Sequence, residues 1–337
     1  MAVGRRTGRV TAAIVAALAL LATACGGGNE SAFFTDDDRL KIATTVSPIT
    51  SIVANVVGDR ADVRGLIPEG VDSHTFEPPP SAAMVLSTAD LVFVNGLKLE
   101  DPTKELAQQN LKDGAEIVEL GDRTITPDQY IFDFSFPREG GKPNPHLWTN
   151  PPYAKDYARI VRDTVARRDP GNAALYNGNY DRFGAKVDEL DSAMKQATVT
   201  VPNRELLTYH DAYAYFARHY GWKVIGAVQV SSFEDPTPRE VAALIQQVRG
   251  EQVPAIFGSE VFPSAVLAQI GREAAVRYVD ELRDDDLPGR PGDRDHSWLG
   301  LMRSNFRTIV SSLGGDPSAI EAVRVENVAP DRAEYPQ

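Results

Sequence analysis

Short apolar runs alternate with longer stretches of mixed polar and apolar residues from Arg39 onward. The short runs have the length of buried strands, and the longer stretches repeat apolar residues every three or four positions, as helices do. In the first half of the chain, the predicted strands and helices cover residues 40–45, 49–57, 63–67, 82–88, 91–94, 103–111 and 117–120. Strands that alternate with helices predict βα units around a mostly parallel sheet.

The same alternation resumes after Pro202 and fills the second half of the chain. Its predicted elements cover residues 206–209, 212–219, 224–230, 238–248, 255–257, 263–273, 275–279 and 298–313. Both halves open alike, because Gly58 follows Thr45, and Gly221 follows Thr208, at the same distance of thirteen residues. We therefore predict an α/β fold with two similar lobes. Ligands of such sheets bind at the carboxyl ends of the strands, so a binding site is expected in the cleft between the lobes.

Two segments between the predicted lobes have a different pattern. Residues 121–145 contain four prolines, a Gly-Gly pair and no His, which predicts a surface loop. Residues 151–198 are predicted to be helical apart from a break at residues 169–171. The helix over residues 173–197 has an apolar face about seven turns long, which is enough to run past both lobes. An ordinary packed surface helix would show the same periodicity.

The N-terminal residues have the features of an export signal. Three Arg precede an apolar stretch of thirteen residues, which ends in small residues directly before Cys25. This order resembles the lipobox of bacterial lipoproteins, in which the Cys becomes the lipidated first residue. We predict a signal peptide over residues 1–24, lipidation of Cys25 and a flexible tether over residues 25–38. The folded body would then lie outside the cytoplasm, anchored to the cell membrane. The alternative is a soluble secreted protein that is cut nearby.

Composition narrows the function classes. The 337 residues carry a formal charge of −12, whereas a protein that grips nucleic acid needs a cationic face, so nucleic acid is excluded as a partner. No apolar run reaches the roughly 18 residues of a membrane-spanning helix, so membrane contact is expected through the lipid only. The single Cys excludes intrachain disulfides and a zinc site built from several thiolates. A metal site in this chain must therefore use His and carboxylates.

Three of the five His stand in segments rich in turn residues: His74, His146 and His210. Neutral imidazole is the usual nitrogen ligand of divalent transition metals. Taken singly, each of these His is more often solvated or hydrogen-bonded than a ligand. The gaps of 72 and 64 residues between them can close only through the fold. The residues alone therefore suggest a metal site without establishing one.

Four motifs stand in order along the chain: SHTFEP at residues 73–78, NGLKLE at 95–100, PHLWTNP at 145–151 and HDAYAYF at 210–216. With these motifs, the chain resembles the zinc and manganese solute-binding lipoproteins of bacterial ABC importers. The resemblance extends from about Lys41 to Leu313. It implies two α/β lobes joined by one long, stiff helix, with a metal ion in the cleft between them.

The resemblance also implies the metal ligands. The three His of the motifs correspond to His74, His146 and His210 here, and an Asp that follows a late strand in the family corresponds to Asp280. One of the neighbouring Asp residues at 284–286, or a water, remains an alternative to Asp280 as the fourth ligand.

Other residues refine this expected site. Glu260 ends a predicted strand, where it would either support a ligand through a hydrogen bond or offset the charge of a helix N-terminus. Three nitrogen ligands and one oxygen ligand favour Zn²⁺ as the transported ion, with Mn²⁺ as the alternative. The acidic insert at residues 283–296 is expected to be a solvated loop, and His219 is expected to be structural.

The resemblance implies an extracytoplasmic solute-binding protein that acts as a monomer, is not an enzyme and delivers its metal to an ABC transporter permease. Its predicted parts are an N-terminal lobe at residues 39–150, a helical connector at 151–198, a C-terminal lobe at 199–325 and a tail at 326–337. One alternative is a secreted zinc metallohydrolase, because three His and a water also form a catalytic zinc site. A second alternative is a surface adhesin that uses the same fold.

Overall fold

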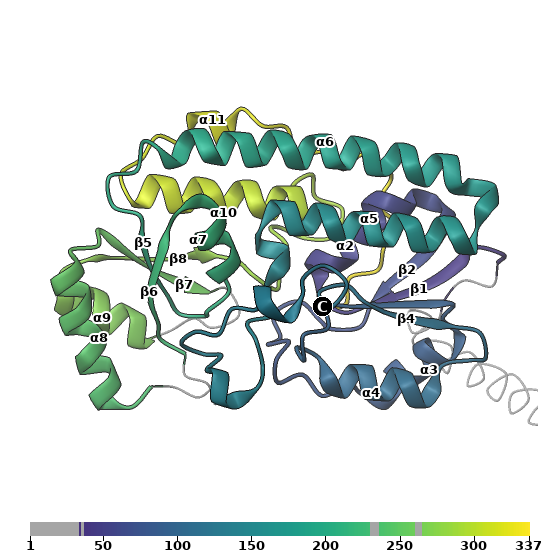
Figure 1. Cartoon of the computed structure of the whole chain (residues 1–337), viewed down its shortest axis with the longest axis horizontal. Helices are drawn as coiled ribbons and strands as arrows, with labels where there is room; N and C mark the ends of the chain where they lie inside the picture. The colour runs from purple at the N-terminus through teal and green to yellow at the C-terminus, as the bar shows by residue number, and fades with distance from the viewer. Residues whose placement is uncertain (1–33, 35–36, 230–235, 260–264) are drawn as a thin grey trace, which may run out of the picture. The chain divides into compact units, whose positions relative to one another are not determined.

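The computed structural model describes residues 34, 37–229, 236–259 and 265–337. The predicted signal peptide, Cys25 and Glu260 lie outside these residues, together with most of the predicted tether. Within the described ranges, we find no helix that is both long enough and apolar enough to cross a membrane. From Phe34 to Gln337 the chain forms one unit that contains two parallel sheets (Figure 1).

The first sheet has the strand order β2-β1-β3-β4, with all strands parallel. Its strands are β1 (Leu40–Thr44), β2 (Ala61–Gly65), β3 (Leu91–Val94) and β4 (Glu116–Glu119), and its helices are α2 (Ser47–Val57), α3 (Pro80–Thr88) and α4 (Asp101–Asn110). Every residue of β3 is buried, as expected for a parallel strand that is covered on both faces. The alternation of strands and helices predicted from the sequence is confirmed here.

The second sheet repeats this arrangement in the order β6-β5-β7-β8. Its strands are β5 (Glu205–Thr208), β6 (Lys223–Ala227), β7 (Ala255–Ser259) and β8 (Arg277–Leu282), and its helices are α7 (Ala214–Tyr220), α8 (Pro238–Glu251), α9 (Ala265–Ala274), α10 (Trp298–Ser312) and α11 (Ser318–Glu321). The two lobes therefore share one topology, and the prediction of two similar parallel-sheet lobes is confirmed.

Two helices connect the lobes, α5 (Pro151–Arg168) and α6 (Ala173–Thr198). With 26 residues, α6 is about 39 Å long. It packs against α2 and α5 on one side of the structure and against α7, α10 and α11 on the other (Figure 1). Its buried face includes Tyr176, Phe183 and Leu190, at the predicted helical spacing. The long helix thus touches both lobes along its length.

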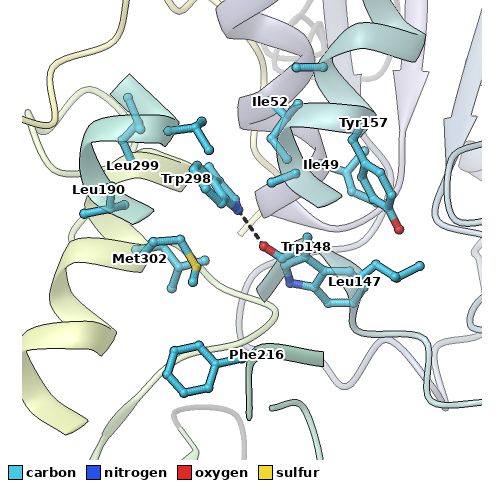
Figure 2. Packing of buried hydrophobic residues seen from close by; sticks show 14 of the residues in the cluster. Ile49, Ile52, Leu147, Trp148, Tyr157, Leu190, Phe216, Trp298, Leu299 and Met302 are labelled. Carbon is cyan, nitrogen blue, oxygen red and sulfur yellow. Dashed lines mark hydrogen bonds between the residues drawn. The ribbon is translucent and has the colours of Figure 1, made fainter. Parts of the chain in front are cut away.

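The largest hydrophobic cluster is shared by the two lobes. Ile49 of α2, Leu190 of α6 and Phe216 of α7 all contribute to it, together with Trp148 and Trp298 (Figure 2). The indole Nε1 of Trp298 donates a hydrogen bond of 2.9 Å to the carbonyl oxygen of Trp148. Each sheet has a smaller cluster of its own beneath its outer helices. Because the main core is common to both lobes, they are not independent packing units.

Two segments outside the sheets, the loop at residues 121–145 and the C-terminal tail, contact distant parts of the structure. The loop at residues 121–145 is irregular, as predicted, but it also crosses to the second lobe, where Ser135 Oγ donates to the Gln229 carbonyl at 2.6 Å. The tail returns to the first sheet, where the Gly65 amide donates to the Glu334 carbonyl at 2.9 Å. Both segments therefore tie sequence-distant parts of the chain together.

Asp191 of α6 joins the long helix to α7. Its Oδ1 accepts hydrogen bonds from His219 Nε2 at 2.7 Å and from the Tyr220 hydroxyl at 2.9 Å, while its Oδ2 accepts from Lys195 Nζ at 2.6 Å. Burial acts to raise the pKa of Asp191, but the bonds from His219, Lys195 and Tyr220 outweigh it and lower the pKa to about 2. The contact agrees with a structural role for His219.

We expect Asp191→Asn to lower the free energy of unfolding by about 1 kcal/mol at neutral pH. This value is smaller than the pKa shift alone would give, because Asp191 is partly exposed to solvent. A carboxyl whose pKa falls from 3.8 to about 2 on folding stabilises the folded state above pH 3.8. That contribution is lost as the pH falls toward 2. Urea unfolding of both proteins across this range measures the difference, and a difference that does not shrink with acidification would contradict the assignment.

Candidate metal centre

Three His side chains meet between the two lobes. His74 lies in the loop after β2, His146 in the loop after β4, and His210 directly after β5. The Nε2 atoms of His74 and His146 are 3.1 Å apart, those of His74 and His210 are 3.3 Å apart, and those of His146 and His210 are 2.8 Å apart. Within the described part of the chain, these three His form a group whose potential ligand atoms all lie within 4.8 Å of one another.

Side-chain amides orient two of the rings. Asn144 Oδ1 lies 2.9 Å from His146 Nδ1, and Gln229 Oε1 contacts His210 Nδ1. An amide oxygen accepts and does not donate, so each Nδ1 carries the ring proton and each Nε2 lone pair faces the cluster. The amide of Asn144 is held in this orientation because its Nδ2 donates to the Asp211 carbonyl at 2.6 Å. Partners of this kind fix the tautomer of metal-binding His.

Neither amide is marked as functional by the sequence pattern. Asn144 stands directly before the third motif and two positions before His146, so the sequence shows that it is near His146 but not that its side chain points toward the ring. Gln229 follows His210 by nineteen residues, at the end of the neighbouring strand region, and no local pattern marks it. Only the pairing of β5 with β6 brings the two together.

Burial favours the neutral form of two of the imidazoles. Desolvation lowers the pKa of His74 and His146 well below the usual range, and the nearby His210 lowers both further. Aromatic side chains contribute to this environment, because the ring centroid of Phe136 lies 5.5 Å from that of His74, and Trp148 lies 5.1 Å from His146. Metal binding needs the unprotonated nitrogen, so this environment favours the binding form.

The structure corrects the expected place of the fourth ligand. Strand β8 continues to Leu282, so Asp280 lies within the strand rather than after it, and its side chain is exposed. Asp280 therefore does not join the His cluster. Asp284 stands two residues beyond the strand, is 2% exposed, and places its Oδ2 3.5 Å from His210 Nε2.

Two contacts hold Asp284 in position. Ser259 Oγ donates to Asp284 Oδ1 at 3.1 Å, and Trp148 Nε1 donates to the Asp284 carbonyl at 2.8 Å. Burial raises the pKa of Asp284 well above its usual range, and the charge of Asp285 raises it further. A dication beside the carboxyl would favour its ionised form. The site is thus arranged so that the negative charge of Asp284 is stabilised by a bound cation.

The acidic insert at residues 283–296 is only partly solvated, because residues 289–294 are exposed, as expected, whereas residues 284–286 are buried. Two of these buried carboxylates accept backbone hydrogen bonds from the loop that carries His74. Asp285 Oδ2 accepts from the Ser73 amide at 3.1 Å, and both oxygens of Asp286 accept from the Gly70 amide at 2.9 Å. The insert, which contains Asp284, is therefore tied to the loop that carries His74.

A second group of contacts, here called the loop clamp, joins the same loops to the tail. It consists of Glu69, Leu287, His296, Tyr335 and Gln337. Glu69 Oε1 lies 3.1 Å from His296 Nε2 and accepts from the Leu287 amide at 3.3 Å. Glu69 Oε2 accepts from Gln337 Nε2 at 3.0 Å, and the ring of Tyr335 packs edge-on against His296 at 4.6 Å. The tail is thus part of the support of the site.

The donor arrangement suits a small divalent ion. The three Nε2 atoms form a triangle with edges of 2.8, 3.1 and 3.3 Å. Its corners lie about 1.8 Å from its centre, so an ion with metal–nitrogen distances of about 2.0–2.1 Å would sit just outside its plane. Asp284 is the carboxylate next to this triangle. Three nitrogen donors and one oxygen donor make a four-ligand set typical of transition metals.

Known proteins resemble this chain along most of its length. The chain matches the family model described as ZnuA, zinc-uptake complex component A, periplasmic, over residues 42–312. Among curated proteins, the manganese-binding lipoprotein MntA of Halalkalibacterium halodurans is 27% identical over 302 residues, which cover 89% of this chain and 97% of that protein. The iron-binding protein YfeA of Yersinia pestis is 27% identical over 281 residues, 82% of this chain and 87% of YfeA.

A solved structure of a zinc-binding protein has a similar fold. The periplasmic zinc-binding protein TroA of Treponema pallidum superposes with a TM-score of 0.74 at 25% identity, over 82% of this chain and 99% of TroA. The family match spans both sheets, the three clustered His and Asp284. The chain therefore belongs to the ZnuA family of periplasmic solute-binding proteins.

Proposed function

We propose that this protein binds a divalent transition metal ion outside the cytoplasm through His74, His146, His210 and Asp284, and delivers the ion to an ABC transporter permease. The observation that carries the proposal is the convergence of the Nε2 atoms of three imidazoles, contributed by both lobes, within 3.3 Å of one another. Relatives named as substrate-binding lipoproteins of metal ABC transporters support the transport role.

Zn²⁺ is the proposed cargo, with Mn²⁺ as the alternative. Three nitrogen donors suit zinc better than manganese in the usual order of affinities. The names of the relatives do not agree on one metal, since they include zinc-, manganese- and iron-binding proteins. The preference for zinc therefore rests on the ligand types of this chain.

The protein is not an enzyme, because its family consists of solute-binding proteins. This disfavours the metallohydrolase considered above. The extracytoplasmic location follows from the same relatives, several of which are named lipoproteins. Lipidation of Cys25 after removal of residues 1–24, and a monomeric state, remain part of the proposal, as do the domain boundaries given above.

Metal titration tests the proposed function. Metal-free protein is expected to bind one equivalent of Zn²⁺ per chain, and to bind Mn²⁺ at the same site at least about tenfold more weakly. Calorimetry with each ion, followed by competition between them, measures stoichiometry and preference. Absence of saturable binding of either ion would refute the proposal, and tighter binding of Mn²⁺ would refute the zinc assignment alone.

A further inference from the structure

A cavity of about 280 Å³ opens beside the metal centre. Of the three clustered His, His74 lines this cavity and is partly exposed, whereas His146 and His210 are buried. The other walls come from the turn at residues 97–99 and from the loop at residues 135–145. The cavity has room for roughly nine waters at about 30 Å³ each, the space of a small organic acid. It therefore reaches the cluster from the side of His74.

The charge of the cavity is opposite to that of the protein. The chain has 47 acidic and 35 basic residues, yet the charged side chains among the described lining residues are Lys98 and Lys142, and none of those residues is acidic. The positive charge of Lys142 acts on the His74 ring. A bare metal dication meets like charge here, whereas a carboxylate meets opposite charge. The cavity thus favours an anion next to the metal centre.

An unusual backbone holds one of these lysines in place. Gly96, Leu97 and Lys98 have consecutive positive φ angles of 79°, 53° and 64°. Residues other than glycine seldom adopt this conformation, and it persists where the surroundings impose it. Asp122 Oδ2 accepts from the Leu97 amide at 2.8 Å, which fixes the turn. Lys98 Nζ then reaches the opposite wall, where it donates to the Gly141 carbonyl at 3.2 Å.

We propose that this cavity binds a small polycarboxylate chelator that arrives with the metal ion and stays in its coordination sphere. The inference rests on the proposed function of the metal centre. The carboxylates of the chelator would face Lys98 and Lys142, and its carbon skeleton would contact Phe136 and Pro143. Three neutral imidazoles and one carboxylate leave a bound dication with net positive charge. An anionic chelator at the exposed side of His74 offsets that charge.

Citrate is a suitable probe of the cavity. Zinc-loaded protein is titrated with citrate in a calorimeter, and its zinc content is measured before and after the titration. We expect saturable binding of one citrate per chain with zinc retained, and at least tenfold weaker binding by Lys98→Glu/Lys142→Glu. Lys142→Glu alone should weaken citrate binding by a smaller factor. Because this variant keeps the contact between Lys98 and Gly141, its loss of affinity cannot come from breaking that contact. The same change of charge at two distant exposed positions, Lys112→Glu/Lys223→Glu, should leave citrate binding unchanged.

Each other outcome has a distinct meaning. If zinc binds but citrate does not saturate, or if citrate binds both double variants equally well, the chelator site is wrong and the proposed metal-binding function stands. If metal-free protein binds citrate equally well, or if citrate removes the zinc, the proposed complex of protein, zinc and chelator is wrong. If the protein binds neither zinc nor manganese in the first place, it is the proposed function that fails.

Discussion

Replacing His210 by alanine is expected to lower the affinity for zinc by more than about 100-fold, and replacing Asp284 by asparagine by about 10- to 100-fold. His210 supplies one of three clustered nitrogens, and its ring is oriented by Gln229, so its loss opens the coordination of the ion. Asp284 supplies negative charge next to His210 in a buried position, which an amide cannot replace. Titration of metal-free variants in competition with a chelator of known affinity measures both losses.

Two matched substitutions separate this result from general damage. His219→Ala removes an imidazole that pairs with Asp191, and Asp280→Asn changes an exposed carboxylate on β8. Both should bind zinc as the unmodified protein does. The assignment of Asp284 fails if Asp280→Asn weakens zinc binding while Asp284→Asn does not.

Replacing Trp298 by alanine is expected to lower the free energy of unfolding by about 3–5 kcal/mol. The side chain is fully buried in the core that both lobes share, and its indole satisfies the Trp148 carbonyl. Truncation therefore leaves a cavity and an unpaired buried acceptor at the same place. Urea unfolding followed by tryptophan fluorescence and by circular dichroism measures the change.

The shared core should also couple the unfolding of the two lobes. Both probes should report one transition, at a lower urea concentration than in the unmodified protein, because loss of the common core affects both lobes together. Val199→Ala, at a side chain that is 73% exposed, serves as the control and should change stability by no more than about 0.5 kcal/mol. Two separate transitions in the Trp298→Ala protein would show that the lobes are stabilised independently.

Local sequence pattern was sufficient to predict most of the fold. β3 was predicted with the bounds that the structure has, and the helix break before α6 was predicted from its Pro-Gly pair. These features depend on residues close together in the chain, such as a fully apolar run or a proline that interrupts a helix. The equal spacing of Thr and Gly in the two halves likewise reflected a shared strand order.

The candidate site was predictable only where a motif marked it. His74, His146 and His210 belong to motifs of a known family, whereas Asp284 belongs to an acidic run that is typical of solvated loops. This acidic run is tied down by hydrogen bonds from a loop more than two hundred residues away in sequence, such as that between the Ser73 amide and Asp285. Asp280 was preferred because β8 was expected to end at Val279, three residues too early. A three-residue error at a strand end was enough to favour a carboxylate that is exposed within the strand.

The loop clamp has a consequence for how the ion is released. Protein groups alone join the His74 loop to the Asp284 loop, so the ligands from the two lobes are held near one another without help from the cargo. Binding then requires little ordering of the chain, and affinity is gained through preorganisation. The same rigidity opposes dissociation. Rapid transfer to a permease would therefore depend on the docked transporter separating these loops, which includes breaking the bond between Gln337 and Glu69.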